Sequence, residues 1–108
     1  MLESSTGDLN LSMRDIHIKS SQPEKTVPLL KDAIERERKL ILHSVSVTKT
    51  RIDNLTASLN VGVPQILRGE VTRTPENEQG LLELEGELAI LQHLEEELSN
   101  IEELQVCP

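Results

Sequence analysis

Histidine is the side chain of this sequence best suited to metal binding, and its three copies stand far apart. His17 lies near the N-terminus, whereas His43 and His93 lie in two long amphipathic segments. If those segments pair as antiparallel helices, His43 and His93 lie at similar positions along the helix axes. A carboxylate such as Glu96 or Glu97 could then complete a metal site. Exposed histidines without a ligand are the simpler interpretation, since no Glu-x-x-His motif of di-iron bundles occurs. We therefore expect no metal and no cofactor.

Nucleophilic and acid–base catalysis lack a complete set of groups. The serines of the first amphipathic segment have no His-plus-acid partner at triad-like spacing, and no glycine pair is followed by the Lys-Ser/Thr of a phosphate loop. For Cys107 we expect a free, exposed thiol. The many carboxylates fall on regular helix faces, where no desolvated pocket would shift a pKa. We expect a protein that is not an enzyme.

The overall composition narrows the class of partner. The 108 residues suffice for one small domain, and Leu, Ile and Val, 33 in all, provide an aliphatic core. Phe, Tyr and Trp are absent, which counts against base-stacking RNA platforms and aromatic ligand cages. One cysteine excludes an intramolecular disulfide, and a net charge of −8 opposes binding to nucleic acid or anionic membrane. Because no long apolar run occurs, we expect a soluble cytoplasmic protein.

Negative charge is concentrated in the last third of the chain. No Lys or Arg follows Arg73, whereas ten glutamates do, so residues 74–108 carry −10 and residues 1–73 carry +2. An acidic segment of this kind is typical of an interaction arm that binds a basic partner protein, although a solvated helix face is the commoner explanation. The candidate partner-binding residues combine three of these acids with two apolar positions outside the main helix seam: Glu95, Glu96, Glu97, Leu82 and Ile90.

The first of two long helices is predicted over residues 28–60. Pro28 suits a first helical turn, and Asn60 followed by Gly62 forms a stop signal. Between these ends, residues spaced four and three apart form a seam of the coiled-coil type. Its apolar members are Ile34, Ile41, Val45, Ile52, Leu55 and Leu59.

The second helix is predicted over residues 75–105, with Thr74 as its N-cap. The connector, residues 61–74, contains a single helical turn closed by Gly69. The apolar seam of the second helix consists of Leu84, Leu88, Leu91, Leu98, Ile101 and Leu104.

Together these elements predict an all-α fold, an antiparallel two-helix coiled-coil hairpin over residues 27–108. The register that aligns the two seams places Leu59 opposite Leu81. Two helices alone bury one apolar stripe each and are only marginally stable, so we expect a homo-oligomer or a hetero-oligomer.

Residues 1–26 are predicted to form a polar N-terminal arm with one possible strand. Apolar residues occupy alternate, odd-numbered positions up to Met13, and then even-numbered positions at Ile16 and Ile18. A bulge near Arg14 would explain this change. A lone strand is not stable, so it must pair with a second chain or remain an extended binding arm.

The order of features resembles a group of small prokaryotic helical-hairpin proteins regarded as antitoxin-like. The features are a strand-like arm (Ile16 to Ile18), a long Glu/Arg-rich helix (Asp32 to Leu59), a Gly69-Glu70-Val71 step and an acidic stretch from Glu76 to Glu78 before a Leu-rich helix. Those relatives carry aromatic residues in the insert and at the start of the second helix, where this chain has none. The hairpin of long helices also resembles prefoldin subunits.

These resemblances imply two functions in addition to the metal-dependent enzyme left open by His43 and His93. The first is a non-enzymatic, antitoxin-like module that binds and neutralises a basic partner protein, for example one that handles nucleic acid. The second is a prefoldin-like chaperone or scaffold subunit. An inhibitor needs an apolar side next to acidic residues, whereas a prefoldin-like subunit needs β-segments at the helix bases and exposed apolar tips.

Overall fold

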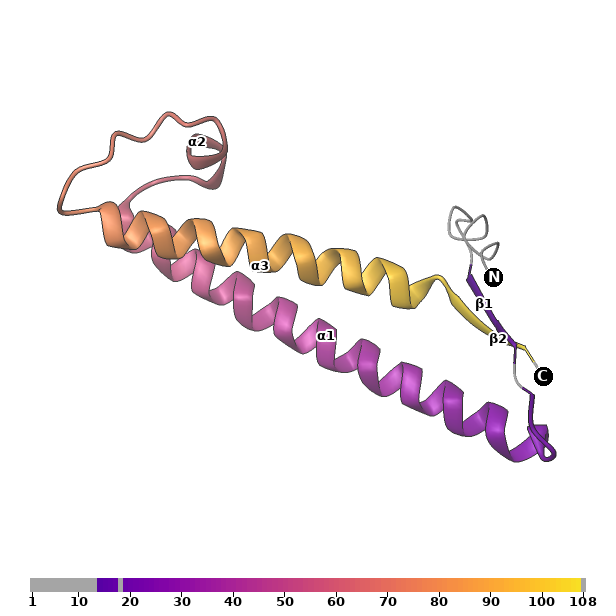
Figure 1. Ribbon diagram of the computed structural model, residues 1–108. Helices are drawn as coiled ribbons and strands as arrows, with labels where there is room; N and C mark the ends of the chain where they lie inside the picture. Colours follow the sequence, from indigo (N-terminus) through magenta and orange to yellow (C-terminus); the bar gives the residue numbers. More distant parts are fainter. Residues whose placement is uncertain (1–13, 18, 108) are drawn as a thin grey trace. The chain divides into compact units, whose positions relative to one another are not determined.

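The computed structural model describes residues 14–17 and 19–107 of the chain. In chain order the described elements are β1 (Arg14–His17), α1 (Pro23–Leu59), α2 (Val63–Leu67), α3 (Glu78–Glu102) and β2 (Leu104–Cys107) (Figure 1). Most of the described residues lie in helices, which confirms the predicted helical character. Met13 and Ile18, which the sequence places in the possible strand, lie outside the described residues.

The chain forms two compact units, and each contains part of both long helices. The described residues up to Leu40, together with those from Glu97 onward, form unit 1, and Ile41–Glu96 form unit 2. The interhelical contacts that follow lie within one unit or the other.

In unit 2, α1 and α3 pack against each other in antiparallel directions. Leu59, at the end of α1, meets Gly80 near the start of α3, where a Cβ atom would come within 2.7 Å of Leu59 Cδ2. Arg51, two turns earlier on α1, is ion-paired with Glu87, two turns later on α3. These two contacts place the end of α1 beside the start of α3, as expected for antiparallel helices.

The core of unit 2 consists mainly of aliphatic residues at the spacing expected for packed helices. Those on α1 are four and three residues apart, and the one polar member is Thr48. The buried residues are Ile41, Val45, Thr48, Ile52, Leu81 and Leu84, of which both leucines are completely buried. Leu81 is absent from the predicted seam. The remaining seam residues of the two helices are half-buried: Ile34, Leu55, Leu59, Leu88, Leu91, Leu98 and Ile101.

The first helix begins at Pro23, five residues before the predicted start at Pro28. The carbonyl of Gln22 accepts hydrogen bonds from the N–H groups of Lys25 and Thr26, both at 3.0 Å, and so closes the first turn. Pro23 takes the first helical position, where a missing N–H is tolerated. Pro28 then lies in the second turn and removes a single backbone donor from the helix. The helix ends at Leu59, and Asn60 adopts a positive φ of 57°, as its role in the stop signal requires.

The second long helix is shorter than the predicted 75–105. Residues 75–77 form a turn, and α3 begins at Glu78. At its other end α3 stops at Glu102, and Leu104 is a strand residue rather than a member of a helical seam.

Strands β1 and β2 pair in parallel within unit 1, so the N-terminal strand has a partner in its own chain. Arg14 lies opposite Leu104 and Ile16 lies opposite Val106 (Figure 1). The prediction that this strand needs a second chain, or stays unpaired, is therefore wrong. Backbone pairing with β1 also explains why the chain leaves the helical conformation after Glu102, since extended residues can complete their hydrogen bonds there.

Candidate protein-binding surface

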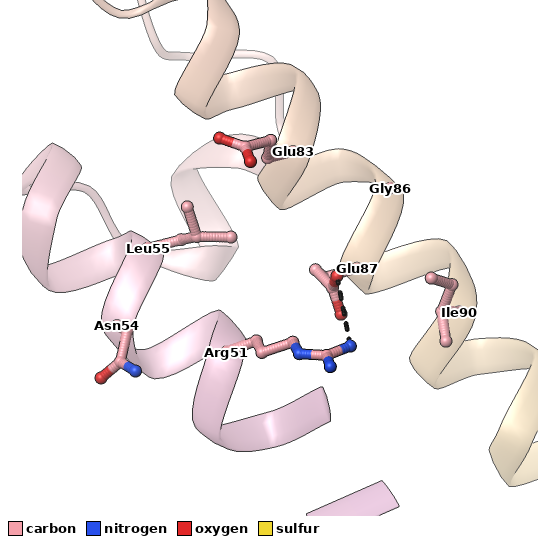
Figure 2. A pocket seen from close by; sticks show the side chains of 7 residues that line it. All are labelled: Arg51, Asn54, Leu55, Glu83, Gly86, Glu87 and Ile90. Carbon is pink, nitrogen blue, oxygen red and sulfur yellow. Dashed lines mark ion pairs between the residues drawn. The ribbon is translucent and has the colours of Figure 1, made fainter. Parts of the chain in front are cut away.

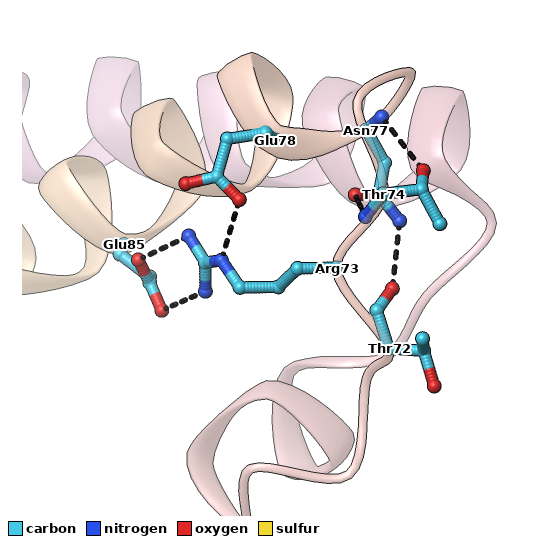
Figure 3. Close-up of polar contacts among 6 residues, drawn as sticks. All are labelled: Thr72, Arg73, Thr74, Asn77, Glu78 and Glu85. Carbon is cyan, nitrogen blue, oxygen red and sulfur yellow. Dashed lines mark hydrogen bonds and ion pairs between the residues drawn. The ribbon is translucent and has the colours of Figure 1, made fainter.

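Arg73 anchors the connector to the start of α3 through two ion pairs. Its Nε donates to Glu78 at 2.8 Å, and its two terminal nitrogens donate to the two carboxylate oxygens of Glu85 at 3.0 and 3.1 Å (Figure 3). Hydrogen bonds from Arg73 lower the pKa of Glu85, and those same bonds raise the pKa of Arg73. This paired, forked geometry fixes the connector more firmly than a single exposed ion pair would.

A reciprocal pair of hydrogen bonds caps the turn that leads into α3. Thr74 Oγ1 accepts from the N–H of Asn77 at 3.2 Å, and Asn77 Oδ1 accepts from the N–H of Thr74 at 2.7 Å (Figure 3). The Asn77 side-chain amide also donates to the carbonyl of Thr72 at 2.9 Å. Thr74 therefore has the capping role that its sequence position predicts.

The anchored connector places α2 beside α3 and leaves a hollow of about 490 Å³ between them. Ile66 and Leu67 of α2 line it together with Leu88, Leu91 and Glu95 of α3, among others. Leu67 remains 73% exposed. The connector thus brings apolar side chains next to those of α3 and leaves the hollow between them open to solvent.

A second depression, the interhelical groove, lies between α1 and α3 of unit 2. It joins two adjacent hollows of about 560 and 400 Å³, which share Arg51 and Ile90. Figure 2 shows the side chains that line the first of them. Its lining includes apolar, small and charged side chains, among them Val47, Arg51, Leu55, Glu83, Gly86, Glu87, Ile90 and Leu94.

Glu87 is the least exposed charged group of this groove. Its side chain is 19% exposed and points toward Arg51, with Oε2 3.9 Å from Arg51 Nη1 (Figure 2). The other oxygen, Oε1, is buried and has no hydrogen-bond partner among the described residues. The Arg51 side chain is 61% exposed. Since 3.9 Å exceeds hydrogen-bonding distance, the carboxylate of Glu87 is only partly compensated.

The candidate residues Leu82 and Ile90 are exposed on α3, at 51% and 47%. At about 100° of rotation per residue, they lie about 80° apart around the helix, with Gly86 between them. These three residues form a strip, here called the α3 strip, that no other part of unit 2 buries.

The three consecutive glutamates do not form one ridge. Successive helical residues point about 100° apart, so Glu95, Glu96 and Glu97 face three directions. Glu95 lines the hollow beside α2, Glu96 is exposed, and Glu97 belongs to unit 1. Arg51, Glu83 and Glu87 line the groove, although the sequence pattern does not predict them as binding residues. The recurrence of Leu82, Gly86 and Ile90 every fourth position is the signal that points to this side of α3.

Unit 1 has a charged cluster of its own on α1 and α3. Arg38 donates two hydrogen bonds to Glu35, at 3.1 and 3.2 Å, and lies 3.8 Å from Glu102. The bonded guanidinium lowers the pKa of Glu35. The single positive charge of Arg38 thus lies between two carboxylates and offsets one of their two negative charges.

Among residues 14–17 and 19–107, no group of three or more His, Cys, Asp or Glu side chains is arranged to hold a metal ion. None of the helices in the same part of the chain is long and apolar enough to span a membrane. Comparisons with protein-family models, with curated proteins and with solved structures gave no match.

Proposed function

We propose that this chain is a non-enzymatic protein-interaction module, antitoxin-like in its role, which binds and neutralises a basic partner protein. One observation carries the proposal: the α3 strip exposes Leu82 and Ile90 next to acidic side chains. Glu83, which follows Leu82 in α3, makes no ion pair with any described residue, and neither does Glu96 farther along the helix. Exposed apolar residues rimmed by uncompensated charge of one sign favour a protein partner of the opposite charge.

The charge balance of unit 2 supports a basic partner. This unit contains four Lys or Arg and nine Asp or Glu, which gives −5 of the chain's −8. Arg68 and Arg73 are already bound to Glu70, Glu78 and Glu85, so they do not offset the remaining acids. The negative potential would accelerate the encounter with a basic protein at low ionic strength.

Copurification of the tagged full-length chain from its native host, with identification of the bound protein, tests this proposal. We expect a stoichiometric complex with one basic protein, whose own activity is suppressed in the complex. Affinity should fall as salt rises, because the Debye length shrinks from about 10 Å at 0.1 M to about 3 Å at 1 M. A complex whose affinity is independent of salt, or a partner of net negative charge, would overturn the proposal.

The triple substitution Glu95→Gln, Glu96→Gln and Glu97→Gln removes three charges with little change in helix propensity. If the partner binds this variant with unchanged affinity and salt dependence, these glutamates form only a solvated face. In that case the double substitution Leu82→Ala and Ile90→Ala should weaken binding of the partner. If neither variant weakens the complex, α3 is not the contact surface.

A prefoldin-like scaffold subunit is the second candidate, and the β-segments favour it. Strand β1 precedes α1 and β2 follows α3, and in the described residues each strand has one edge without a partner strand. A ladder of two four-residue strands is marginally stable alone and can be extended by another chain. Light scattering of the full chain tests this candidate. A defined oligomer that Ile16→Pro dissociates supports it, and a monomer at high concentration counts against it.

A further inference from the structure

We infer that the interhelical groove of unit 2 receives a helix of the partner protein, and that a Lys or Arg of this helix replaces Arg51 beside Glu87. The inference rests on the proposed function and specifies its contact. It draws on three features of the groove: an incompletely compensated carboxylate, a weakly held internal cation, and a glycine at which an added Cβ atom would meet nothing within 4 Å among the described residues.

Glu87 provides the recognition group. Its carboxylate is largely removed from water, but its nearest cation lies 3.9 Å away and Oε1 has no donor among the described residues. Charge-assisted hydrogen bonds to a carboxylate are shorter, about 2.7–2.9 Å. A Lys or Arg entering the groove could make such bonds after rotation of the terminal torsion of Glu87, which has a broad energy minimum.

Arg51 is the group that such a cation would displace. Its side chain is 61% exposed, so its guanidinium can move into water without leaving a cavity. Lys49 lies two residues away on α1, is also exposed, and does not line the groove. The two residues therefore differ in their relation to Glu87 while contributing the same charge, and they form a matched pair for experiment.

Gly86 allows a helix backbone to approach closely. A Cβ atom added there would meet nothing within 4 Å, whereas one added at Gly80 would strike Leu59. Packing within the chain thus explains Gly80 but not Gly86, although a glycine inside a helix weakens it. A bare backbone beside the exposed Ile90 is the surface that another helix can approach most closely.

The dimensions and chemistry of the groove favour a helix as its occupant. Along α1 the lining extends from His43 to Leu55, about 18 Å or three helical turns. An amphipathic helix laid between two antiparallel helices can direct apolar residues at Val47, Leu55 and Ile90. A second copy of this acidic chain is a poorer fit, because like charges would face each other.

A synthetic peptide serves as the probe for the groove. We would use an 18-residue amphipathic helix of Leu and Lys with one Trp, about 27 Å long, against the full-length chain. Because the chain has no Trp or Tyr, the tryptophan fluorescence reports the peptide alone. A Leu/Glu peptide and a Leu/Lys peptide of scrambled order are the controls, and neither should bind comparably.

Two matched pairs of variants test the role of charge. Glu87→Gln should weaken peptide binding by about tenfold or more, the effect of losing one charge-assisted bond, whereas Glu96→Gln should weaken it only slightly. Arg51→Gln should strengthen binding several-fold more than Lys49→Gln, because only Arg51 competes for Glu87. Equal effects within both pairs would mean that the peptide responds to net charge, and the inference would be wrong.

Gly86→Ala and Gly86→Leu test the close approach. Alanine should raise the thermal stability of the chain while weakening the peptide complex, and leucine should abolish binding, so the loss cannot reflect unfolding. In nitrogen-15 spectra the amide of Gly86 should shift on peptide addition and that of Gly69 should not. Unchanged affinity in both variants, or no peptide binding to the natural chain, would overturn the inference.

The inference and the proposed function can fail separately. If the copurified partner loses affinity with Glu95→Gln and Glu96→Gln but not with the Gly86 or Glu87 variants, the proposed function stands and the groove is not the contact. If the peptide occupies the groove but no basic partner is found, the groove binds cationic helices and the proposed function fails. Self-association of the chain that the peptide disrupts would identify a second copy as the occupant, contrary to the inference.

Discussion

Two glycines six residues apart on α3 should respond in opposite ways to substitution by alanine. At Gly86 the added Cβ meets nothing within 4 Å, so the helix gains about 1 kcal/mol of propensity. At Gly80 the same gain is opposed by a Cβ placed 2.7 Å from Leu59 Cδ2. Overpacking of this kind costs about 1–3 kcal/mol, so Gly80→Ala should be neutral or destabilising by up to about 2 kcal/mol.

Thermal unfolding followed by circular dichroism at 222 nm measures the difference between the two variants. For a chain of this size, 1 kcal/mol corresponds to a change in Tm of about 4–8 °C. We therefore expect Gly86→Ala to melt several degrees above the natural chain, and Gly80→Ala to melt at or below it. The two substitutions share one helix and one chemical change, so each is the control for the other.

A double-mutant cycle with Leu59→Ala isolates the contact itself. Once the Leu59 side chain is shortened, the added Cβ at Gly80 has no methyl group to displace, and Gly80→Ala should then stabilise the chain by about 1 kcal/mol. A stabilisation by Gly80→Ala in the natural background, equal to that at Gly86, would show that Leu59 does not pack on Gly80 and would refute the helix contact on which the groove depends.

Three further predictions concern the core and the connector. Leu84→Ala should destabilise the chain by about 2–5 kcal/mol in urea denaturation, whereas Leu82→Ala should change stability by less than about 0.5 kcal/mol, because only Leu84 is buried. Thr74→Ala should cost about 0.5–2 kcal/mol in the same assay, and Thr74→Ser should restore most of the loss. The pKa of Glu85 lies below its ordinary value of 4.5, so the ion pair with Arg73 contributes fully above pH 4.5 and is lost as the pH falls through the lowered pKa. Protection factors of the connector amides, which correct for the pH dependence of intrinsic exchange, should fall over that acidic range in the natural chain and should already be low at neutral pH in Glu85→Gln. Protection that persists in Glu85→Gln would show that the ion pair does not hold the connector.

The helices could be predicted from the sequence because their signals are local and repeated. The 4-3 spacing from Ile41 to Ile52 continues over several turns, and helix ends are fixed by nearby residues such as Asn60 and Thr74. The start of α1 was misplaced because Pro23 and Pro28 both suit a first turn. Only the hydrogen bonds of the Gln22 carbonyl distinguish them.

Strand β2 could not be predicted because the cause of its conformation is remote in sequence. Leu104 continues the leucine spacing of α3, so the local pattern favours more helix there. The extended conformation depends on pairing with β1, some ninety residues earlier in the chain. A single strand signal near Ile16 does not reveal which segment will pair with it.

The candidate site could be predicted only in part, because acidic residues that are neighbours in the sequence do not lie on the same face of a helix. The count of glutamates after Arg73 correctly identifies α3 as acidic, but Glu95, Glu96 and Glu97 diverge around the helix. Glu87 looks like any other acidic residue in the sequence. What distinguishes it is partial burial against Arg51, which depends on the register of two helices.

That register links the glycine experiment to the groove. The contact of Leu59 with Gly80 and the pair of Arg51 with Glu87 lie about two turns apart on the same two helices, and one alignment satisfies both. A shift of one residue along α1 moves α3 by about 1.5 Å, which would break or tighten an ion pair at 3.9 Å. If alanine at position 80 displaces α3 in this way, it should also change the affinity of the Leu/Lys peptide, although residue 80 does not line the groove. In the Leu59→Ala background the same substitution should raise stability and leave the peptide affinity unchanged, since the methyl groups that it would displace are then absent.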